Sequence, residues 1–283
     1  MTTKTVDLYE YFGIGRKDAR KGYLTLYVRD DLTEMAKKRV RPAMLVIPGG
    51  GYCNVSQREG EPIALRFFAE GFNAFVLEYD VAPQHYPVQL LQAGMAMLYL
   101  RREAARLGVD GERIAAIGFS AGGHLAGCTG FVWDDPALRE AFGDECARIC
   151  PDALVLSYPV VTADKRYYHG GSFRNFCGGD EGHETFSLEK RVRKGAPPCF
   201  IWATTPDDCV PVENSLLLYS ALKNAGAHVE MHLFEEGWHG LSTADDEVLD
   251  DTDFPFLVRV AEWLPMAVSF LRAHGFTVQR QDR

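Results

Sequence analysis

Short runs of aliphatic and β-branched residues recur along the chain, and most of them lack alternating polar positions. Continuous apolar strands of this kind are typical of a sheet that is buried on both faces. The runs cover residues 23–28, 43–47, 74–79, 114–119, 153–157, 199–203 and 229–234. We predict a strand over each run.

Patterns with the period of an α-helix lie between or after several of these runs. They cover residues 89–107, 211–224 and 255–274, and the last begins at Pro255. The apolar pattern of 211–224 stops at Gly226, a residue that often ends a helix. This alternation of strands and helices predicts an α/β fold, with a mostly parallel central sheet and helices on both faces.

A long segment rich in glycine, aromatic and charged residues separates two of the predicted strands. It covers residues 158–198 and follows the carboxyl end of the strand 153–157, where open α/β sheets bind ligands. Loops of this length in compact domains are usually functional or mobile. We therefore predict a small cap over 158–198 within a single domain that covers residues 1–283.

Charge and composition narrow the classes of function. The chain has 30 Lys and Arg against 39 Asp and Glu residues, a net charge of −9, without a basic stretch that could follow a phosphate backbone. No run reaches the roughly 18 apolar residues of a membrane helix, and residues 1–13 lack the apolar core of a secretory signal. We expect a cytoplasmic protein with no nucleic-acid partner and no membrane contact.

The cysteines are scattered and odd in number, with 7 in the chain. In a chain of this length they are expected to be reduced thiols rather than disulfide partners. Cys146 and Cys150 could lie one helical turn apart, but no two further ligands lie near them. We expect no metal site.

One serine stands between two glycines at the end of an apolar run, in the segment GFSAG of residues 118–122. This G-x-S-x-G pattern places a serine on a sharp turn between a strand and a helix. An apolar strand precedes Ser120, and the segment AGGHLAG that follows can begin a helix whose first amides favour negative charge. Ser120 is therefore a candidate nucleophile.

A second glycine-rich turn follows the predicted strand 43–47, in the segment PGGGY of residues 48–52. Such a loop presents backbone N–H groups, which stabilise the oxyanion that forms during acyl transfer. We predict that the amides of Gly50, Gly51 and Ala121 surround that oxygen.

The serine also needs a base and a carboxylate, which in this type of hydrolase follow it in the order acid, then histidine. Asp207 and Asp208 come after the predicted strand 199–203, and His239 comes after the strand 229–234. All of them lie at carboxyl ends of strands and can therefore converge with Ser120. His124 is a weaker base because it lies on the serine's own predicted helix.

Several further motifs occur in the same order as in a known family. They are PGGGY at 48–52, REGEPIALRF at 58–67, YDVAP at 79–83, GFSAGGHLAG at 118–127, PDDCVPVENS at 206–215 and GWHGL at 237–241. With these motifs the chain resembles the α/β-hydrolases, and among them the small carbohydrate esterases of the acetylxylan esterase and BD-FAE type. The resemblance implies an α/β-hydrolase fold.

The resemblance also implies roles for the candidate residues. Ser120 would be the nucleophile, His239 the base and Asp207 the acid, with Asp208 as the weaker alternative. The implied activity is that of a serine esterase that needs no cofactor and releases acetyl groups from carbohydrates such as acetylated xylo-oligosaccharides. Lipase relatives usually begin the oxyanion loop with histidine where this chain has Pro48, so the anchoring of the loop differs.

Aromatic residues near these motifs suggest how a sugar ester is held. We predict that Tyr52, Trp238 and His169 contact substrate, in a wall that also includes Tyr167, Tyr168 and Phe173. The same rings could instead pack the cap onto the core. The expected partner is a small ester, and a homo-oligomer is compatible with the sequence. Alternatives are a formamidase or a peptidase of the same fold, or a non-catalytic ligand-binding relative.

Overall fold

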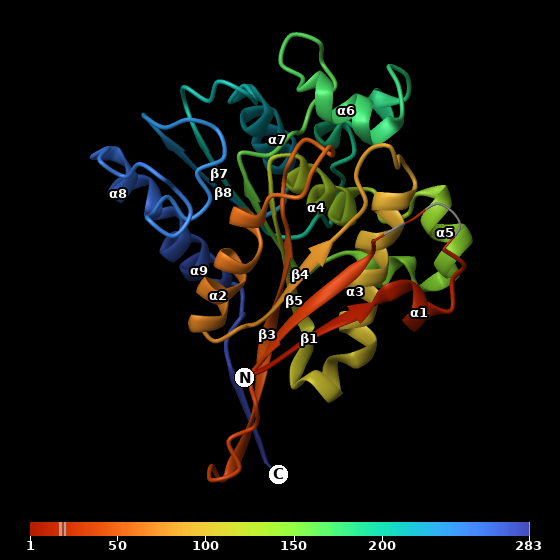
Figure 1. Ribbon diagram of the computed structural model, residues 1–283, viewed down its shortest axis with the longest axis vertical. Coiled ribbons are helices and arrows are strands. Elements are labelled where there is room, and N and C mark those ends of the chain that lie inside the picture. The colour runs from red at the N-terminus through yellow and green to blue at the C-terminus, as the bar shows by residue number, and fades with distance from the viewer. Residues whose placement is uncertain (17–18, 20, 283) are drawn as a thin grey trace.

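The computed structural model describes residues 1–16, 19 and 21–282, and it has helices on both sides of a central sheet (Figure 1). Within the described residues the sheet has nine strands in the order β1-β2-β4-β3-β5-β6-β7-β8, and β9 pairs with β3. The strands are β1 (Thr2–Asp7), β2 (Tyr23–Val28), β3 (Lys37–Ile47), β4 (Asn73–Glu78), β5 (Val109–Phe119), β6 (Ala153–Ser157), β7 (Cys199–Thr204), β8 (Val229–Phe234) and β9 (Gln279–Asp282).

Parallel pairing brings the carboxyl ends of the central strands to one edge of the sheet. The strands β4, β3, β5, β6, β7 and β8 pair in parallel, whereas β1 and β2 are antiparallel at one side. In register, Ile47 at the end of β3 faces Gly118 of β5, and Phe119 faces Ser157 at the end of β6. The loops that follow these strands therefore meet.

Helices cover both faces of this sheet. The α-helices are α1 (Leu8–Phe12), α2 (Glu61–Ala69), α3 (Val88–Leu107), α4 (Ala121–Phe131), α5 (Pro136–Phe142), α6 (Gly170–Cys177), α7 (Glu213–Asn224), α8 (Phe256–Ala261) and α9 (Trp263–Ala273). Short 3₁₀ helices are η1 (Gln57–Glu59), η2 (Gly143–Ile149), η3 (His183–Phe186) and η4 (Leu188–Lys190). None of the helices in the described part of the chain is long and apolar enough to cross a membrane.

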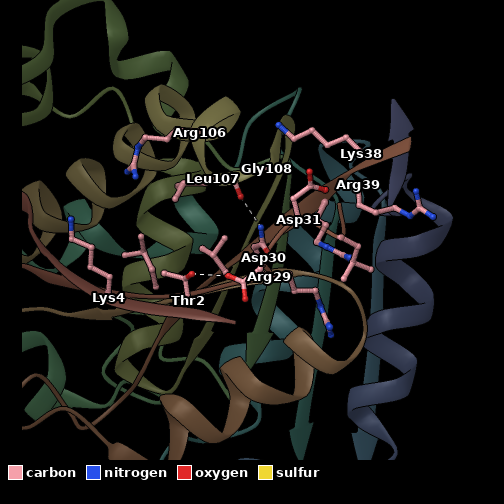
Figure 2. A pocket seen from close by; sticks show the side chains of 15 residues that line it. Thr2, Lys4, Arg29, Asp30, Asp31, Lys38, Arg39, Arg106, Leu107 and Gly108 are labelled. Atoms are coloured by element: carbon pink, nitrogen blue, oxygen red, sulfur yellow. Dashed lines mark hydrogen bonds between the residues drawn. The ribbon is translucent and has the colours of Figure 1, made fainter. Parts of the chain in front are cut away.

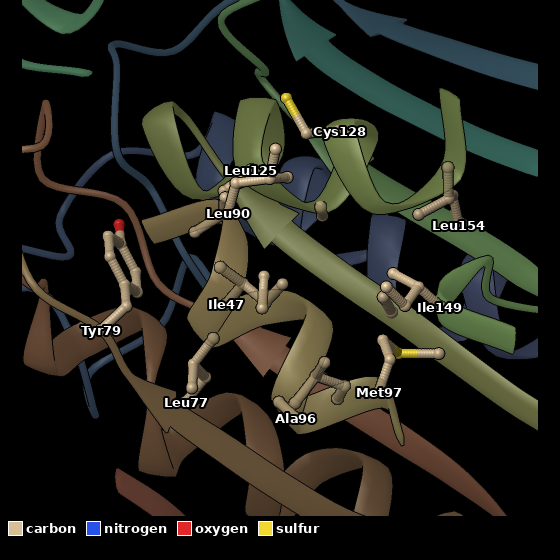
Figure 3. Packing of buried hydrophobic residues seen from close by; sticks show 14 of the residues in the cluster. Ile47, Leu77, Tyr79, Leu90, Ala96, Met97, Leu125, Cys128, Ile149 and Leu154 are labelled. Atoms are coloured by element: carbon tan, nitrogen blue, oxygen red, sulfur yellow. The ribbon is translucent and has the colours of Figure 1, made fainter. Parts of the chain in front are cut away.

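Each face of the sheet has its own hydrophobic core. On one face, side chains of β3, β4, α3 and α4 pack together, among them Ile47, Leu77, Met97 and Leu125 (Figure 3). On the other face, α2, α8 and α9 cover the sheet, and Trp263 of α9 is fully buried there. Burial of one such large side chain stabilises the fold by roughly 1.5–3 kcal/mol.

The predicted α/β architecture is confirmed, and the structure contains a strand at each predicted run. The predicted helix over 255–274 is wrong as one element, because α8 ends at Ala261 and α9 begins at Trp263. Pro265 explains the break, since it has no N–H for the carbonyl of Ala261 and its ring collides with that group. The edge strands β1 and β9 had no apolar signal, because their residues are mostly exposed.

The insertion, residues 158–198, contains α6, η3 and η4, and α6 lies beyond the carboxyl ends of the strands (Figure 1). The buried Asn214 of α7 holds its first residues in place. Asn214 Oδ1 accepts from the amides of Val161 and Thr162 at 2.9 and 3.1 Å, and its Nδ2 donates to the Tyr167 carbonyl at 2.8 Å.

Candidate active site

Ser120 sits on the sharp turn between β5 and α4, as the G-x-S-x-G pattern predicts. Its backbone has φ 52° and ψ −121°, a conformation that costs a non-glycine residue free energy and is common at functional sites. Two hydrogen bonds hold the turn, because the Ser120 amide donates to the Ser157 carbonyl and the Val160 amide donates to the Ser120 carbonyl, each at 3.0 Å. The turn places the serine hydroxyl at the carboxyl edge of the sheet.

The two glycines that flank the serine are required by close backbone contacts. A Cβ atom on Gly118 would lie 2.2 Å from the Gly122 carbonyl oxygen, and one on Gly122 would lie 2.2 Å from the Ile47 oxygen. No real Cβ atom comes so close to backbone. Glycine at both positions therefore lets α4 begin directly beside the loop that follows β3.

The structure brings Ser120, His239 and Asp207 into one hydrogen-bonded chain. Ser120 Oγ lies 2.8 Å from His239 Nε2, and His239 Nδ1 lies 2.7 Å from Asp207 Oδ2. Because a carboxylate only accepts, Nδ1 carries the ring hydrogen and Nε2 is left to accept from the serine hydroxyl. This arrangement can take a proton from Ser120.

The structure separates the two candidate acids. The Asp207 side chain is 1% exposed, and its Oδ1 accepts from the amides of Cys209 and Val210 at 2.9 and 2.8 Å. These bonds aim its other oxygen at His239. Asp208 is exposed, and among the described residues the carboxylate bonded to His239 is that of Asp207.

Backbone hydrogen bonds orient the loop after β3. The Gly49 carbonyl accepts from the Ser56 amide at 3.0 Å, and the Gly50 carbonyl accepts from the Cys53 amide at 3.0 Å. A trans peptide points its N–H away from its C=O. The two bonds therefore fix the directions of the N–H groups of Gly50 and Gly51.

Three amides near the serine are free to receive an anion. In the part of the chain that the structure describes, the N–H groups of Gly50, Gly51 and Ala121 have no protein acceptor. Ala121 is also the first residue of α4, where the helix dipole favours negative charge. The predicted oxyanion donors are therefore unoccupied by other protein groups.

Two side chains anchor the loop that begins at Pro48. The Tyr79 hydroxyl donates to the Pro48 carbonyl at 2.6 Å, and the Gly49 amide donates to Glu59 Oε2 at 2.8 Å. The loop is thus held by two buried side chains, those of Tyr79 and Glu59.

Tyr52 does not lie where a substrate could reach its ring. The side chain is fully buried, and its hydroxyl lies 2.8 Å from His124 Nδ1. His124 Nε2 lies 2.9 Å from the Phe186 carbonyl, and burial lowers the pKa of His124 to about 4. The prediction that Tyr52 contacts substrate is corrected, as is that for the buried Phe173, because both rings pack the insertion onto the core.

His169 and Trp238 remain accessible beside the triad. His169 is half-buried, and its Nδ1 accepts from the Ser172 amide at 3.3 Å. The other ring nitrogen, Nε2, lies 3.7 Å from Cys209 Sγ. Burial, followed by the nearby His239, lowers the pKa of His169. Trp238 is half-buried and packs edge-on against Phe254 with ring centroids 5.1 Å apart. His169 therefore links the insertion to the loop of Asp207.

Two family models match successive parts of the chain. The BD-FAE family model matches residues 31–156, and the prolyl oligopeptidase family model matches residues 153–260. Endo-1,4-beta-xylanase B from Butyrivibrio fibrisolvens is 41% identical over 216 residues, which are 73% of this chain and 33% of that protein. The chain thus spans about a third of that relative.

Two solved structures resemble nearly the whole chain. The acetyl ester-xyloside bifunctional hydrolase from Caldicellulosiruptor lactoaceticus is 33% identical with a TM-score of 0.79, over 96% of this chain and 97% of that one. MGS-M1, an alpha/beta hydrolase enzyme from a Medee basin deep-sea metagenome library, is 33% identical with a TM-score of 0.75, over 97% and 98%. The chain belongs to the α/β-hydrolase family. The BD-FAE match and the likeness to an acetyl ester-xyloside hydrolase confirm the predicted resemblance to carbohydrate esterases of the BD-FAE type.

Sequence reasoning assigned no role to several polar residues that build the site of this α/β-hydrolase. Glu59 and Asn214 lie within the motifs REGEPIALRF and PDDCVPVENS. The motifs marked these positions, but they did not indicate which contacts the two side chains make. Tyr158 and Asn175 had no such signal. Asn175 Nδ2 donates to the Gly51 carbonyl at 2.8 Å and joins α6 to the oxyanion loop. Among the described residues, no cluster of three or more His, Cys, Asp or Glu could hold a metal ion.

Proposed function

We propose that this α/β-hydrolase is a carboxylic ester hydrolase that removes acetyl groups from carbohydrates such as acetylated xylo-oligosaccharides. The observation that carries the proposal is the hydrogen-bonded chain from Ser120 through His239 to Asp207, beside free amides. The BD-FAE match and the likeness to an acetyl ester-xyloside hydrolase support the ester and sugar parts of the substrate.

In the first step, Ser120 Oγ attacks the ester carbonyl carbon while His239 Nε2 takes the hydroxyl proton. Asp207 holds the ring in the required tautomer and stabilises the imidazolium that forms. The amides of Gly50, Gly51 and Ala121 donate to the oxyanion, which carries charge only in the tetrahedral state. These donors therefore stabilise the transition state more than the substrate.

Collapse of the tetrahedral state gives the acyl enzyme. His239 returns the proton to the leaving sugar oxygen, which departs as an alcohol and leaves Ser120 acetylated. Water then attacks the same carbonyl, with His239 as base again, and acetate is released. Ser120 regains its proton at the end of the cycle.

A narrow site favours a short acyl group. Ser120 is only 7% exposed. Three rings of the insertion are buried against the core, those of Phe173, Phe176 and Phe186. A methylene that enters an open cavity gains roughly 0.8 kcal/mol, whereas one that displaces packed atoms costs roughly 1–3 kcal/mol. We infer that 158–198 acts as a small cap, and that His169 and Trp238 face the sugar.

A panel of esters tests this proposal. We expect kcat/KM to fall from acetyl to butyryl esters of one aryl alcohol, with octanoyl esters nearly inert, and acetylated xylo-oligosaccharides to be substrates. A preference for octanoyl esters would overturn the short-chain assignment. Turnover of aryl acetates without any release of acetate from the oligosaccharides would overturn the carbohydrate assignment.

Peptide-bond hydrolysis is a second candidate, favoured by the match of residues 153–260 to the prolyl oligopeptidase family. The same panel includes aminoacyl anilides, and it includes N-formylkynurenine as a formamide. Faster turnover of an anilide or of the formamide than of aryl acetates would replace the esterase assignment.

A further inference from the structure

A buried carboxyl group lies at the floor of the site, outside the triad. Glu59 is the last residue of η1 and is 4% exposed. Its Oε2 accepts from the Gly49 amide and its Oε1 accepts from the Tyr158 hydroxyl, each at 2.8 Å. Gly49 belongs to the oxyanion loop, whereas Tyr158 follows β6, so one side chain joins two parts of the site.

Tyr158 contacts both Glu59 and the catalytic histidine, His239. Its ring lies edge-on to the His239 ring with centroids 5.0 Å apart, and its hydroxyl accepts from the Ser242 amide at 3.0 Å. Ser242 lies in the same loop as His239. The backbone of Tyr158 has φ 37°, which costs a non-glycine residue free energy. Such strained backbone occurs mainly at functional sites. Tyr158 therefore contacts both the histidine ring and its loop.

The hydrogen bonds assign a direction to each group. Because the Tyr158 hydroxyl receives the Ser242 N–H, its own hydrogen goes to Glu59. Both oxygens of Glu59 thus act as acceptors, which is the arrangement that a carboxylate satisfies. Burial raises the pKa of Glu59, and the bonds from Tyr158 and Gly49 oppose that rise.

The other arm of Glu59 ends close to the nucleophile. A Cβ atom on Gly49 would lie 2.8 Å from Glu59 Oε2 and 3.0 Å from Ser120 Cβ. Gly49 therefore fills the space between the carboxyl group and the serine. Its carbonyl group is part of the peptide whose N–H belongs to Gly50, so a shift of Gly49 moves a predicted oxyanion donor.

We infer that Glu59 is a positioning residue that fixes the oxyanion loop and His239 relative to each other, an inference that rests on the proposed function. The hydrogen bonds of Glu59 go to Gly49 and Tyr158, whereas Ser120 Oγ is bonded to His239. It acts through Gly49 on one side and through Tyr158 on the other. Together with Tyr79, which donates to the Pro48 carbonyl, it anchors the oxyanion loop.

The test replaces Glu59 by an amide of the same shape. In Glu59→Gln the side-chain oxygen stays with the Gly49 N–H, so the NH₂ group faces Tyr158 and the tyrosine hydrogen loses its acceptor. We expect kcat for an aryl acetate to fall about 10- to 100-fold, less than the roughly 10²- to 10³-fold loss on removal of one oxyanion donor. We expect KM to stay within about twofold, because ground-state binding is untouched.

Asp135→Asn is a matched control. Asp135 is 4% exposed, and its Oδ1 accepts from the Tyr86 hydroxyl and the Ala137 amide, each at 2.9 Å. Both bonds end on Oδ1, which asparagine keeps, so the variant removes a buried carboxylate charge at the start of α5 and leaves the bonds of the oxyanion loop and of His239 in place. We expect this variant to lose thermal stability without a change in kcat per titrated active site.

Two further measurements separate positioning from a general loss of structure. A trifluoromethyl ketone that adds to Ser120 forms an oxyanion, and Glu59→Gln should weaken its binding by the same factor as kcat/KM. Tyr158→Phe removes the same bond to Glu59 and also the acceptor of the Ser242 amide. Its loss should therefore be at least as large as that of Glu59→Gln, and the double variant should be no worse than Tyr158→Phe. All rates are normalised to the active sites titrated with a fluorophosphonate.

The outcomes distinguish the two proposals. If wild-type protein hydrolyses aryl acetates and Glu59→Gln matches Asp135→Asn in kcat and in ketone affinity, the role of Glu59 is overturned. Additive losses in the double variant would also overturn it, because the two residues would then act independently. If wild-type protein hydrolyses no ester, the proposed function fails first.

Discussion

Polar groups lie at both ends of the parallel strands, but their arrangement differs between the two ends. At the carboxyl end, Ser120, His239 and Asp207 point at one another, and the backbone around Ser120 is strained. At the amino end, a cavity of about 360 Å³ is lined by six cations and two carboxylates (Figure 2). These are Lys4, Arg29, Lys38, Arg39, Arg41, Arg106, Asp30 and Asp31.

The cations of the amino-end cavity do not converge on a common point. The side chains of Arg39 and Arg106 point away from each other (Figure 2). The Arg29 guanidinium lies 4.1 Å from the centre of the Phe68 ring, and Arg41 Nη1 donates to the Gly71 carbonyl at 3.3 Å. These groups hold the edge of the sheet together. Convergence and backbone strain, rather than charge and a cavity, therefore distinguish the candidate active site from the amino end of the sheet.

The largest effect should follow the loss of the nucleophile. Ser120→Ala should lower kcat/KM for an aryl acetate by roughly 10⁴–10⁶, because the members of a triad act as a unit. Circular dichroism and thermal melting should match the wild type, since the substitution removes one hydroxyl. Residual turnover above about one hundredth of the wild-type rate would show that another group attacks the ester.

The next effect should distinguish the two neighbouring acids. Asp207→Asn should lower kcat by about 10²-fold or more, because the amide no longer fixes the tautomer of His239. Asp208→Asn serves as the control, and its kcat should stay within about twofold of wild type, since the substitution neutralises an exposed carboxylate that is not bonded to His239. Steady-state kinetics on purified variants measure both. The reverse ranking would move the acid to Asp208.

A smaller effect concerns the stability of the carboxyl end. His124 has a lowered pKa of about 4 in the fold, against about 6.5 in an unfolded chain. The unfolded chain therefore binds a proton first as the pH falls, and up to about 3 kcal/mol of stability present above pH 6.5 is lost toward pH 4.

Denaturant unfolding at pH 7 and pH 5 measures this loss. The decrease between the two pH values should be smaller in His124→Gln than in wild type. His228→Gln replaces an exposed histidine and should keep the wild-type decrease. An equal decrease in all three proteins would show that His124 does not couple folding to pH.

The smallest effect should come from the amino-end cavity. Lys4→Ala and Lys38→Ala should each leave kcat/KM within about twofold and the free energy of unfolding within about 0.5 kcal/mol. Phosphate should not change either quantity. A loss of activity in these variants would mean that the two ends of the sheet are coupled, and the comparison would fail.

The sequence predicted those parts that depend on local pattern. Apolar runs located the buried strands, and the glycines around Ser120 located the turn. The positions of Asp207 and His239 directly after their strands predicted the other two members of the hydrogen-bonded triad. Each of these features is set by a strand and the few residues that follow it, so each can be read without the fold.

Other features depend on contacts between distant segments. The choice between Asp207 and Asp208 depends on which side chain the turn buries beneath His239. The burial of Tyr52 depends on His124 and on the insertion, so its aromatic character was misleading. Glu59 stood in a recognised motif, but its role depends on Tyr158, which lies 99 residues away. The strands β1 and β9 pair at exposed edges and need no apolar side chains.

Covalent labelling tests the central claim most directly. A fluorophosphonate should modify the wild-type protein once per chain, peptide mass spectrometry should place the label on Ser120, and acetyl esterase activity should fall in proportion to labelling. Ser120→Ala should remain unlabelled. A label on a different serine, or acetyl ester turnover that persists when Ser120 is fully modified, would contradict the account.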